Sequence, residues 1–156
     1  MEYTRNSNPN FYKENQTMSN CGSFAFNIKE WYSPDCDFID DYGDIEEWIS
    51  INLQYGDEWE VSDLFAHMLA KYILRDFSDV RYLTYADEIE PNEELIAFRT
   101  FVNEDEMWDF HFKVFRDGMW QEKCGSGPVK FCEEDEWQTG VNSYISETLY
   151  FAKLIA

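Results

Sequence analysis

The sequence predicts an α+β fold in which N-terminal helices pack on a C-terminal antiparallel sheet. Apolar residues at helical spacing fill the first half of the chain, and short β-branched or aromatic segments separated by turn residues fill the second half. Helices followed by strands are typical of this class. The length of 156 residues, with 44% hydrophobic and 19% aromatic side chains, suits one core. We therefore expect a flexible N-terminal arm over residues 1–18 and a single α+β domain over residues 19–156.

The first helix is expected to begin at Ser19 or Asn20, either of which can cap it, and to end at Pro34. Its apolar face would consist of Phe24, Ile28, Trp31 and Tyr32. A short acidic helix is expected over 45–53, and the clearest helix of the chain over 61–73. The stripe of that last helix comprises Val61, Leu64, Phe65, Met68, Leu69, Tyr72 and Ile73.

Five segments of the second half read as strands because they are rich in β-branched and aromatic residues, and several of them alternate with polar residues. They are 95–102, 107–115, 119–123, 129–132 and 148–155. Asp117-Gly118 between the second and third is a signal for a two-residue hairpin turn. We expect these segments to form an antiparallel sheet.

The hairpin brings polar residues together around His111. Alternation puts His111 on the face opposite Phe110 and Phe112, and a two-residue turn makes His111 face Cys124 with Glu122 at the diagonal position. A carboxylate beside a histidine can orient the ring and stabilise its imidazolium. A one-residue bulge would shift the facing set, so either Glu122 or Cys124 could be the neighbour of His111.

Cys21 is expected at the start of a helix, where the helix dipole favours a thiolate, as does a nearby protonated histidine. Cysteine is also among the most buried residue types, so a structural thiol is the alternative. A nucleophile on a helix that packs on a sheet carrying the base would make a workable cysteine hydrolase.

A set of short motifs between residues 20 and 132 carries a family resemblance. They are Asn20-Cys21, Phe24-Ala25, Asp109-Phe110-His111-Phe112, Asp117-Gly118, Trp120, Lys123, Gly125-Ser126 and Pro128-Val129. Together they resemble small papain-like cysteine hydrolases related to NlpC-type peptidases, and more closely a group of small proteins carried by phages and mobile elements of Gram-positive bacteria. The resemblance implies that Cys21 is the nucleophile, His111 the general base and Glu122 the orienting residue. A second histidine often stands at the Glu122 position in that group, so this chain also fits a protein that kept the fold and lost the reaction.

The formal charge of −20 and the isoelectric point near 4.2 disfavour contact with nucleic acid or an anionic membrane. A host protein with a basic surface is the better partner. Residues 35–60 hold ten carboxylates and no Lys or Arg, and this expected acidic binding surface comprises Asp35, Asp37, Asp40, Asp41, Asp44, Glu46, Glu47, Asp57, Glu58 and Glu60. Such carboxylates can imitate a phosphate backbone and occupy a basic groove.

No apolar run approaches the length of a membrane span, and the opening residues lack the apolar core of a secretion signal, so we expect a cytoplasmic protein. The resemblance to phage and mobile-element proteins implies that this cytoplasm is that of a bacterial host cell. Its four cysteines are then thiols. Cys21, His111, Cys124 and Cys132 are ligand types that suit zinc, but the spacing of Cys124 and Cys132 is not that of a compact zinc motif. We predict neither metal nor cofactor.

Two hypotheses of different class follow. The first is a papain-like cysteine hydrolase or transferase that acts on an amide or thioester of a host protein. The second is a non-catalytic acidic inhibitor, a nucleic-acid mimic of the anti-CRISPR or anti-restriction type, that blocks a bacterial defence nuclease. The sequence identifies neither the target nor the oligomeric state.

Overall fold

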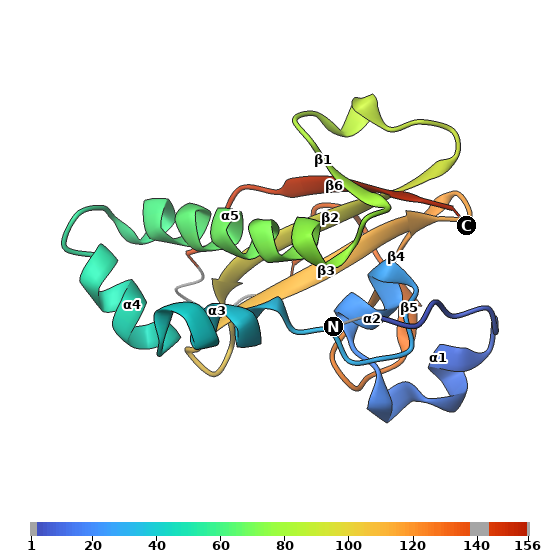
Figure 1. Cartoon of the computed structure of the whole chain (residues 1–156), viewed down its shortest axis with the longest axis horizontal. Coiled ribbons are helices and arrows are strands. Elements are labelled where there is room, and N and C mark those ends of the chain that lie inside the picture. The colour runs from blue at the N-terminus through green and yellow to red at the C-terminus, as the bar shows by residue number, and fades with distance from the viewer. Residues whose placement is uncertain (1–2, 138–143, 156) are drawn as a thin grey trace.

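An antiparallel sheet with helices against it forms the framework of the chain. The computed structural model describes residues 3–137 and 144–155, and within those residues it has five α-helices and six strands. The strand order is β1-β6-β2-β3-β4-β5, and every neighbouring pair is antiparallel (Figure 1). The predicted α+β class is therefore confirmed.

The strands lie close to the expected segments. Their bounds are β1 Val80–Leu83, β2 Glu93–Val102, β3 Trp108–Arg116, β4 Met119–Lys123, β5 Val129–Phe131 and β6 Leu149–Leu154. The sequence analysis missed β1, a four-residue strand at the sheet edge. Asp117 and Gly118 both have positive φ, 55° and 77°, as a tight hairpin turn requires. The turn sets Lys113 opposite Glu122, which is the register that a two-residue turn implies.

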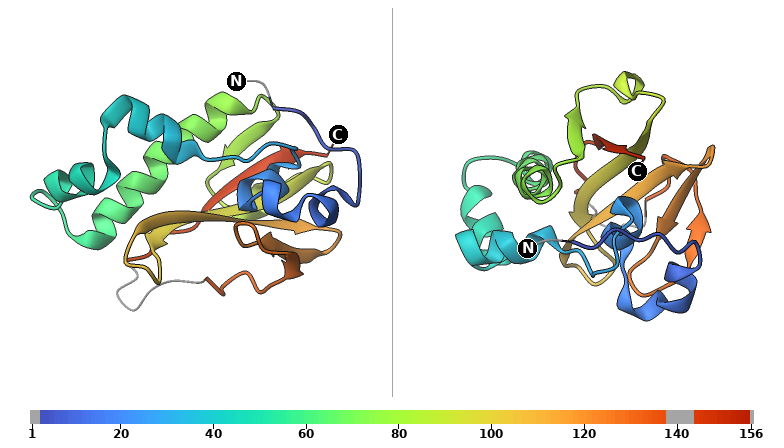
Figure 2. Two further views of the ribbon diagram at one scale, coloured as in Figure 1. Left: turned by 90° about the horizontal axis from the view of Figure 1, so that it is seen from below. Right: turned by 45° about the vertical axis from the view of Figure 1, so that its right-hand side comes forward.

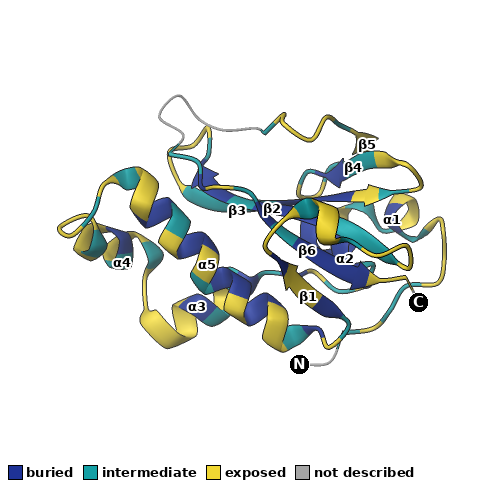
Figure 3. Ribbon diagram, turned by 90° about the horizontal axis from the view of Figure 1, so that it is seen from above, coloured by how far each residue is buried: buried dark blue, intermediate teal, exposed yellow. Residues whose placement is uncertain are grey.

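The helices precede the sheet in the chain. Their bounds are α1 Phe11–Glu14, α2 Cys21–Phe26, α3 Pro34–Tyr42, α4 Ile45–Asn52 and α5 Glu58–Asp76, with 3-10 turns η1 at Gln16–Met18 and η2 at Ala86–Glu88. The predicted helices over 45–53 and 61–73 correspond to α4 and α5. The buried stripe of α5 faces the sheet, with its polar side outward (Figure 3). No helix in the described residues has the length and apolar composition needed to cross a membrane.

The predicted helix from Asn20 to Pro34 is wrong beyond Phe26. Asn27 adopts the left-handed conformation, with φ of 54°, and its N–H donates to the carbonyls of Phe24 and Ser23, which ends α2 after six residues. Pro34 begins α3 instead, because its fixed φ and missing N–H suit the first position of a helix.

The first residues differ from the flexible arm that we expected. Residues 3–18 include α1 and η1, and Tyr12 is only 7% exposed. The Tyr12 hydroxyl lies 2.9 Å from the carbonyl oxygens of both Ser23 and Ile28. The segment thus packs beside α2, away from α3 and α4 (Figure 2).

The main core joins both helical groups to one face of the sheet. Phe26 of α2 contacts Phe112 of β3 edge to face, and Phe98 of β2 stacks on Phe112. Phe65 of α5 belongs to the same cluster. The opposite face of β3 is also covered, because the buried ammonium of Lys113 donates to the carbonyls of Glu133 and Glu136. His111 shares that second face, so it lies in a sheltered setting and not on an open surface.

Candidate active site

Asn20 fixes the position of Cys21 at the start of α2. Its side-chain oxygen accepts hydrogen bonds from the N–H groups of Ser23 and Tyr32, at 3.0 and 3.1 Å, and its amide donates to the Tyr32 carbonyl at 2.7 Å. The Ser23 hydroxyl accepts from the Asn20 N–H, which completes a capping box. Buried hydrogen bonds at Asn20 and Ser23 therefore fix the backbone on both sides of Cys21.

Gly22 allows the chain to approach Tyr32 closely. A Cβ atom at Gly22 would lie 2.9 Å from Tyr32 Cδ2 and 3.1 Å from the Tyr32 carbonyl oxygen. Only glycine fits this gap without displacement of the backbone. The residue type at this position is a feature that the sequence analysis did not use.

Lys123, the last residue of β4, ties the sheet to the start of α2. Its ammonium is fully buried and donates to the carbonyls of Gln16, Ser19 and Gly125. Burial lowers the pKa of Lys123. Sequence reasoning gave Lys123 only a place in the family resemblance.

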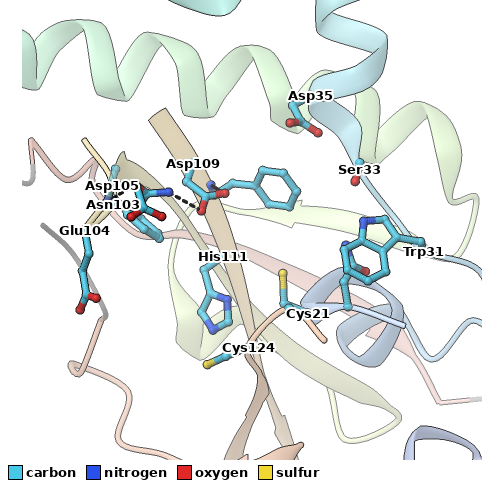
Figure 4. A pocket seen from close by; sticks show the side chains of 14 residues that line it. Cys21, Trp31, Ser33, Asp35, Asn103, Glu104, Asp105, Asp109, His111 and Cys124 are labelled. Atoms are coloured by element: carbon cyan, nitrogen blue, oxygen red, sulfur yellow. Dashed lines mark hydrogen bonds between the residues drawn. The ribbon is translucent and has the colours of Figure 1, made fainter. Parts of the chain in front are cut away.

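His111 and Glu122 form the pair that the hairpin predicted. His111 Nε2 lies 2.7 Å from Glu122 Oε1, and the two side chains are 12% and 7% exposed. The sulfur of Cys21 lies on one side of the imidazole and that of Cys124 on the other (Figure 4). Because Nε2 is engaged with Glu122, Nδ1 is the nitrogen left to exchange a proton with a thiol.

The electrostatics favour a protonated imidazole. Burial alone would lower the pKa of His111, but its hydrogen bonds with Cys124, Cys21 and Glu122 outweigh burial and raise this pKa well above the usual range. Burial would raise the pKa of Glu122, yet the bond to His111 and the charges of His111 and Lys113 bring it down to about 2. His111 and Glu122 therefore form an imidazolium–carboxylate pair, and a nearby imidazolium stabilises a thiolate.

Glu122 and Cys124 are both neighbours of His111. Glu122 bonds the ring, and Cys124 Sγ lies 3.4 Å from the same Glu122 oxygen. Cys132 is a further neighbour: burial and the Glu122 charge raise the pKa of its thiol to about 11. The sequence named Cys132 only as a ligand type that suits zinc, because its place beside Glu122 follows from the register of β5.

A pocket of about 450 Å³ opens beside these residues. Cys21, His111 and Cys124 line one side, and carboxylates of Asp35 and Asp109 line another (Figure 4). Cys21 is 6% exposed, but this pocket gives its thiol a route to a bound molecule. Burial and the Asp109 charge raise the pKa of Asp35, and its Oδ1 is buried with no hydrogen-bond partner among the described residues.

The ten acidic residues lie on α3, on α4 and around the start of α5, together at one end of the molecule (Figure 1). They do not form one uniform surface. Asp35 lines the pocket, and Asp37 pairs with Arg75 at 2.9 Å. Seven of the ten are exposed: Asp40, Asp41, Asp44, Glu46, Glu47, Asp57 and Glu60.

Chemically, the arrangement can move a proton and support a nucleophilic sulfur. The Cys21 thiol, the His111 imidazole and the Glu122 carboxylate follow one another in space beside a pocket, and the carboxylate fixes the orientation of the ring. Comparison of the chain with protein-family models, curated proteins and solved structures found no match.

Proposed function

We propose that this protein is a papain-like cysteine hydrolase or transferase that acts on an amide or thioester of another protein. The observation that carries the proposal is that Cys21 of α2 and His111 of β3 line one pocket, and that Glu122 of β4 bonds the His111 ring. Glu122 replaces the second histidine of the phage and mobile-element proteins that the sequence resembles. It nevertheless makes the bond to Nε2 that an orienting residue needs.

The reaction would run in two halves. The proton of the Cys21 thiol passes to His111 before the attack, the Cys21 sulfur then attacks the carbonyl carbon, and His111 gives this proton to the leaving amine or thiol as the scissile bond breaks. The resulting thioester on Cys21 is attacked by water, or by an acceptor amine in a transferase. His111 removes a proton from this second nucleophile and returns it to the Cys21 sulfur as the acyl group departs. Glu122 holds the imidazolium throughout.

The test is the alkylation rate of each cysteine by iodoacetamide at neutral pH, read by mass spectrometry. We expect Cys21 to react faster than the exposed Cys36 despite its burial, and the His111→Ala variant to slow Cys21 without changing Cys36. Cys21 reacting more slowly than Cys36, with no effect of His111, would identify a structural thiol and remove the proposal.

We also propose which kind of protein is the substrate and in which compartment the reaction takes place. Its support is the resemblance to phage and mobile-element proteins together with the net charge of −20. The substrate would be a host protein with a basic surface in the cytoplasm of a bacterial cell, with no direct contact to nucleic acid or membrane. An acidic protein gains in encounter rate with such a partner, and the gain falls with salt.

The exposed carboxylates on α3 and α4 favour a second candidate function, a non-catalytic inhibitor of a bacterial defence nuclease of the kind that anti-CRISPR and anti-restriction proteins block. The test is inhibition of DNA cleavage by a purified CRISPR or restriction nuclease. The variant with Asp40, Asp41, Asp44, Glu46 and Glu47 changed to Asn or Gln should lose inhibition, and Cys21→Ser should keep it. Equal inhibition by the neutralised variant would dismiss nucleic-acid mimicry.

A further inference from the structure

Three adjacent strands bring together four side chains of types that bind metals: His111 in β3, Glu122 in β4, and Cys124 and Cys132 one residue beyond β4 and β5. His111 of β3 is diagonal to Glu122 of β4, since Lys113 pairs with Glu122. The pairing of Gln121 with Phe131 places Cys132 opposite Trp120, and the Cys132 N–H donates to the Trp120 carbonyl at 3.1 Å. Cys132 is therefore diagonal to Glu122 as well, on the same face.

Three of the four side chains, those of His111, Glu122 and Cys124, have donor atoms close together, and the strand register adds Cys132 as the fourth. One donor atom each of His111, Glu122 and Cys124 lie within 4.8 Å of one another. Zinc takes nitrogen at about 2.0–2.1 Å and sulfur at about 2.3 Å, so neighbouring tetrahedral donors are roughly 3.3–3.8 Å apart. Side-chain rotations have to bring these three donors to that spacing and turn the Cys132 sulfur toward them. We propose that His111, Glu122, Cys124 and Cys132 form a binding site for Zn²⁺.

The charges support this proposal. Two thiolates, a carboxylate and Zn²⁺ sum to one negative charge, and the ammonium of Lys113 lies on the same face as a compensating positive charge. Lys113 is held there by the carbonyls of Glu133 and Glu136 and by the ring of Trp137, whose centroid is 4.4 Å from Nζ. The site is half-enclosed, and its mixed nitrogen, sulfur and oxygen donors are those of zinc sites.

The inference reverses the expectation that no metal binds. The spacing of Cys124 and Cys132 along the chain hides the site, because the donors come from separate strands. It also goes beyond the proposed function. A zinc ion on His111 Nε2 displaces the bond to Glu122, so the zinc-bound form lacks the oriented ring that proton transfer from Cys21 needs.

The experiment is titration of the reduced, chelator-treated full chain with Co²⁺, a spectroscopic substitute for Zn²⁺, followed by displacement with Zn²⁺. We expect one ion per chain with tetrahedral ligand-field bands and thiolate-to-cobalt charge transfer. Cys124→Ser and Cys132→Ser should each weaken binding more than the roughly 10- to 100-fold that loss of an outer-shell partner costs. Cys36→Ser, on the exposed α3 position, is the matched control and should bind as the wild type does.

A second measurement covers the case in which a serine variant misfolds. In the wild-type chain, Zn²⁺ should protect Cys124 and Cys132 from alkylation and leave Cys36 unprotected. Binding that is equal in the wild type and in either folded serine variant would overturn the inference, as would a cobalt spectrum with oxygen ligands only, which would place the ion on the acidic helices. Absence of protection at Cys124 and Cys132 would also overturn it. None of these readouts depends on hydrolase activity, so the two proposals fail separately.

Discussion

His111 Nε2 and Glu122 Oε1 are 2.7 Å apart across the β3–β4 hairpin, and both side chains are almost fully buried. The contact follows from the tight turn at Asp117-Gly118, which sets the strand register. It gives the imidazole one fixed orientation towards the pocket that Cys21 lines.

Glu122→Gln should lower the reactivity of Cys21. The amide keeps the shape of the side chain but removes the negative charge that stabilises the imidazolium, and one pKa unit on either partner corresponds to about a tenfold change in ionisation. We expect the alkylation rate of Cys21 at neutral pH to fall by about tenfold, as measured by mass spectrometry, with Cys36 as the internal reference. An unchanged rate would mean that Glu122 is not a positioning residue for His111.

Gly22→Ala should destabilise the fold. The new methyl group would meet the side chain and the carbonyl oxygen of Tyr32, and overpacking of this kind costs about 1–3 kcal/mol in the free energy of unfolding. Urea denaturation measures the loss. Gly56→Ala is the control, because its Cβ would meet only the flexible side chain of Glu60, at 3.3 Å or more. Equal stability of the two variants would contradict the close approach at Gly22.

Lys123→Met should also destabilise the chain, and Lys130→Met should not. The first change leaves the carbonyls of Gln16, Ser19 and Gly125 without their shared donor, and the buried Ser19 carbonyl left unsatisfied costs about 1–3 kcal/mol. Lys130 is exposed on β5. Thermal unfolding of both variants checks the prediction, and a wild-type melting temperature for Lys123→Met would refute it.

Asp35→Asn should stabilise the protein at neutral pH. Burial and the Asp109 charge raise the pKa of the Asp35 carboxyl, so the folded state binds its proton more tightly than the unfolded state does. The protonated Asp35 carboxyl therefore adds to the free energy of unfolding, fully below the unfolded-state pKa of about 3.9. This contribution is lost as the pH rises through the folded-state pKa. Asn does not ionise, so the variant avoids the cost of a buried Asp35 carboxylate at neutral pH.

The gain from Asp35→Asn should therefore be present at pH 7 and disappear below about pH 4. Urea unfolding across this pH range measures it, with the exposed Asp40→Asn as the control. A gain that does not depend on pH would point to an effect other than ionisation.

The sequence predicted what local rules determine and missed what tertiary packing determines. Alternation and the Asp117-Gly118 turn were enough to bring His111 to Glu122, and helical spacing was enough to find α4 and α5. The apolar residues Ile28 and Tyr32 suggested a longer α2, but a left-handed Asn27 sends them into the core without helical structure. Spacing alone cannot reveal this.

Long-range contacts account for the other omissions. The role of Lys123 depends on carbonyls more than a hundred residues away, at Gln16 and Ser19. Cys132 reaches Glu122 only through the register of β5. The acidic stretch looked uniform in the sequence, yet the fold turns Asp35 into the pocket and leaves Asp40 in solvent.

The contacts of Tyr12 and of the Gln16 carbonyl show that the residues before α2 support the helix that carries Cys21. Residues 3–18 hold α2 at both of its ends: Tyr12 bonds the carbonyls of Ser23 and Ile28, and Gln16 shares the ammonium of Lys123 with Ser19. A shortened protein cut at Ser19 would keep all three residues of the candidate triad and lose the contacts that hold the helix carrying its sulfur. Anyone who trims, fuses or transplants this domain should therefore treat the opening segment as part of the support of the candidate active site.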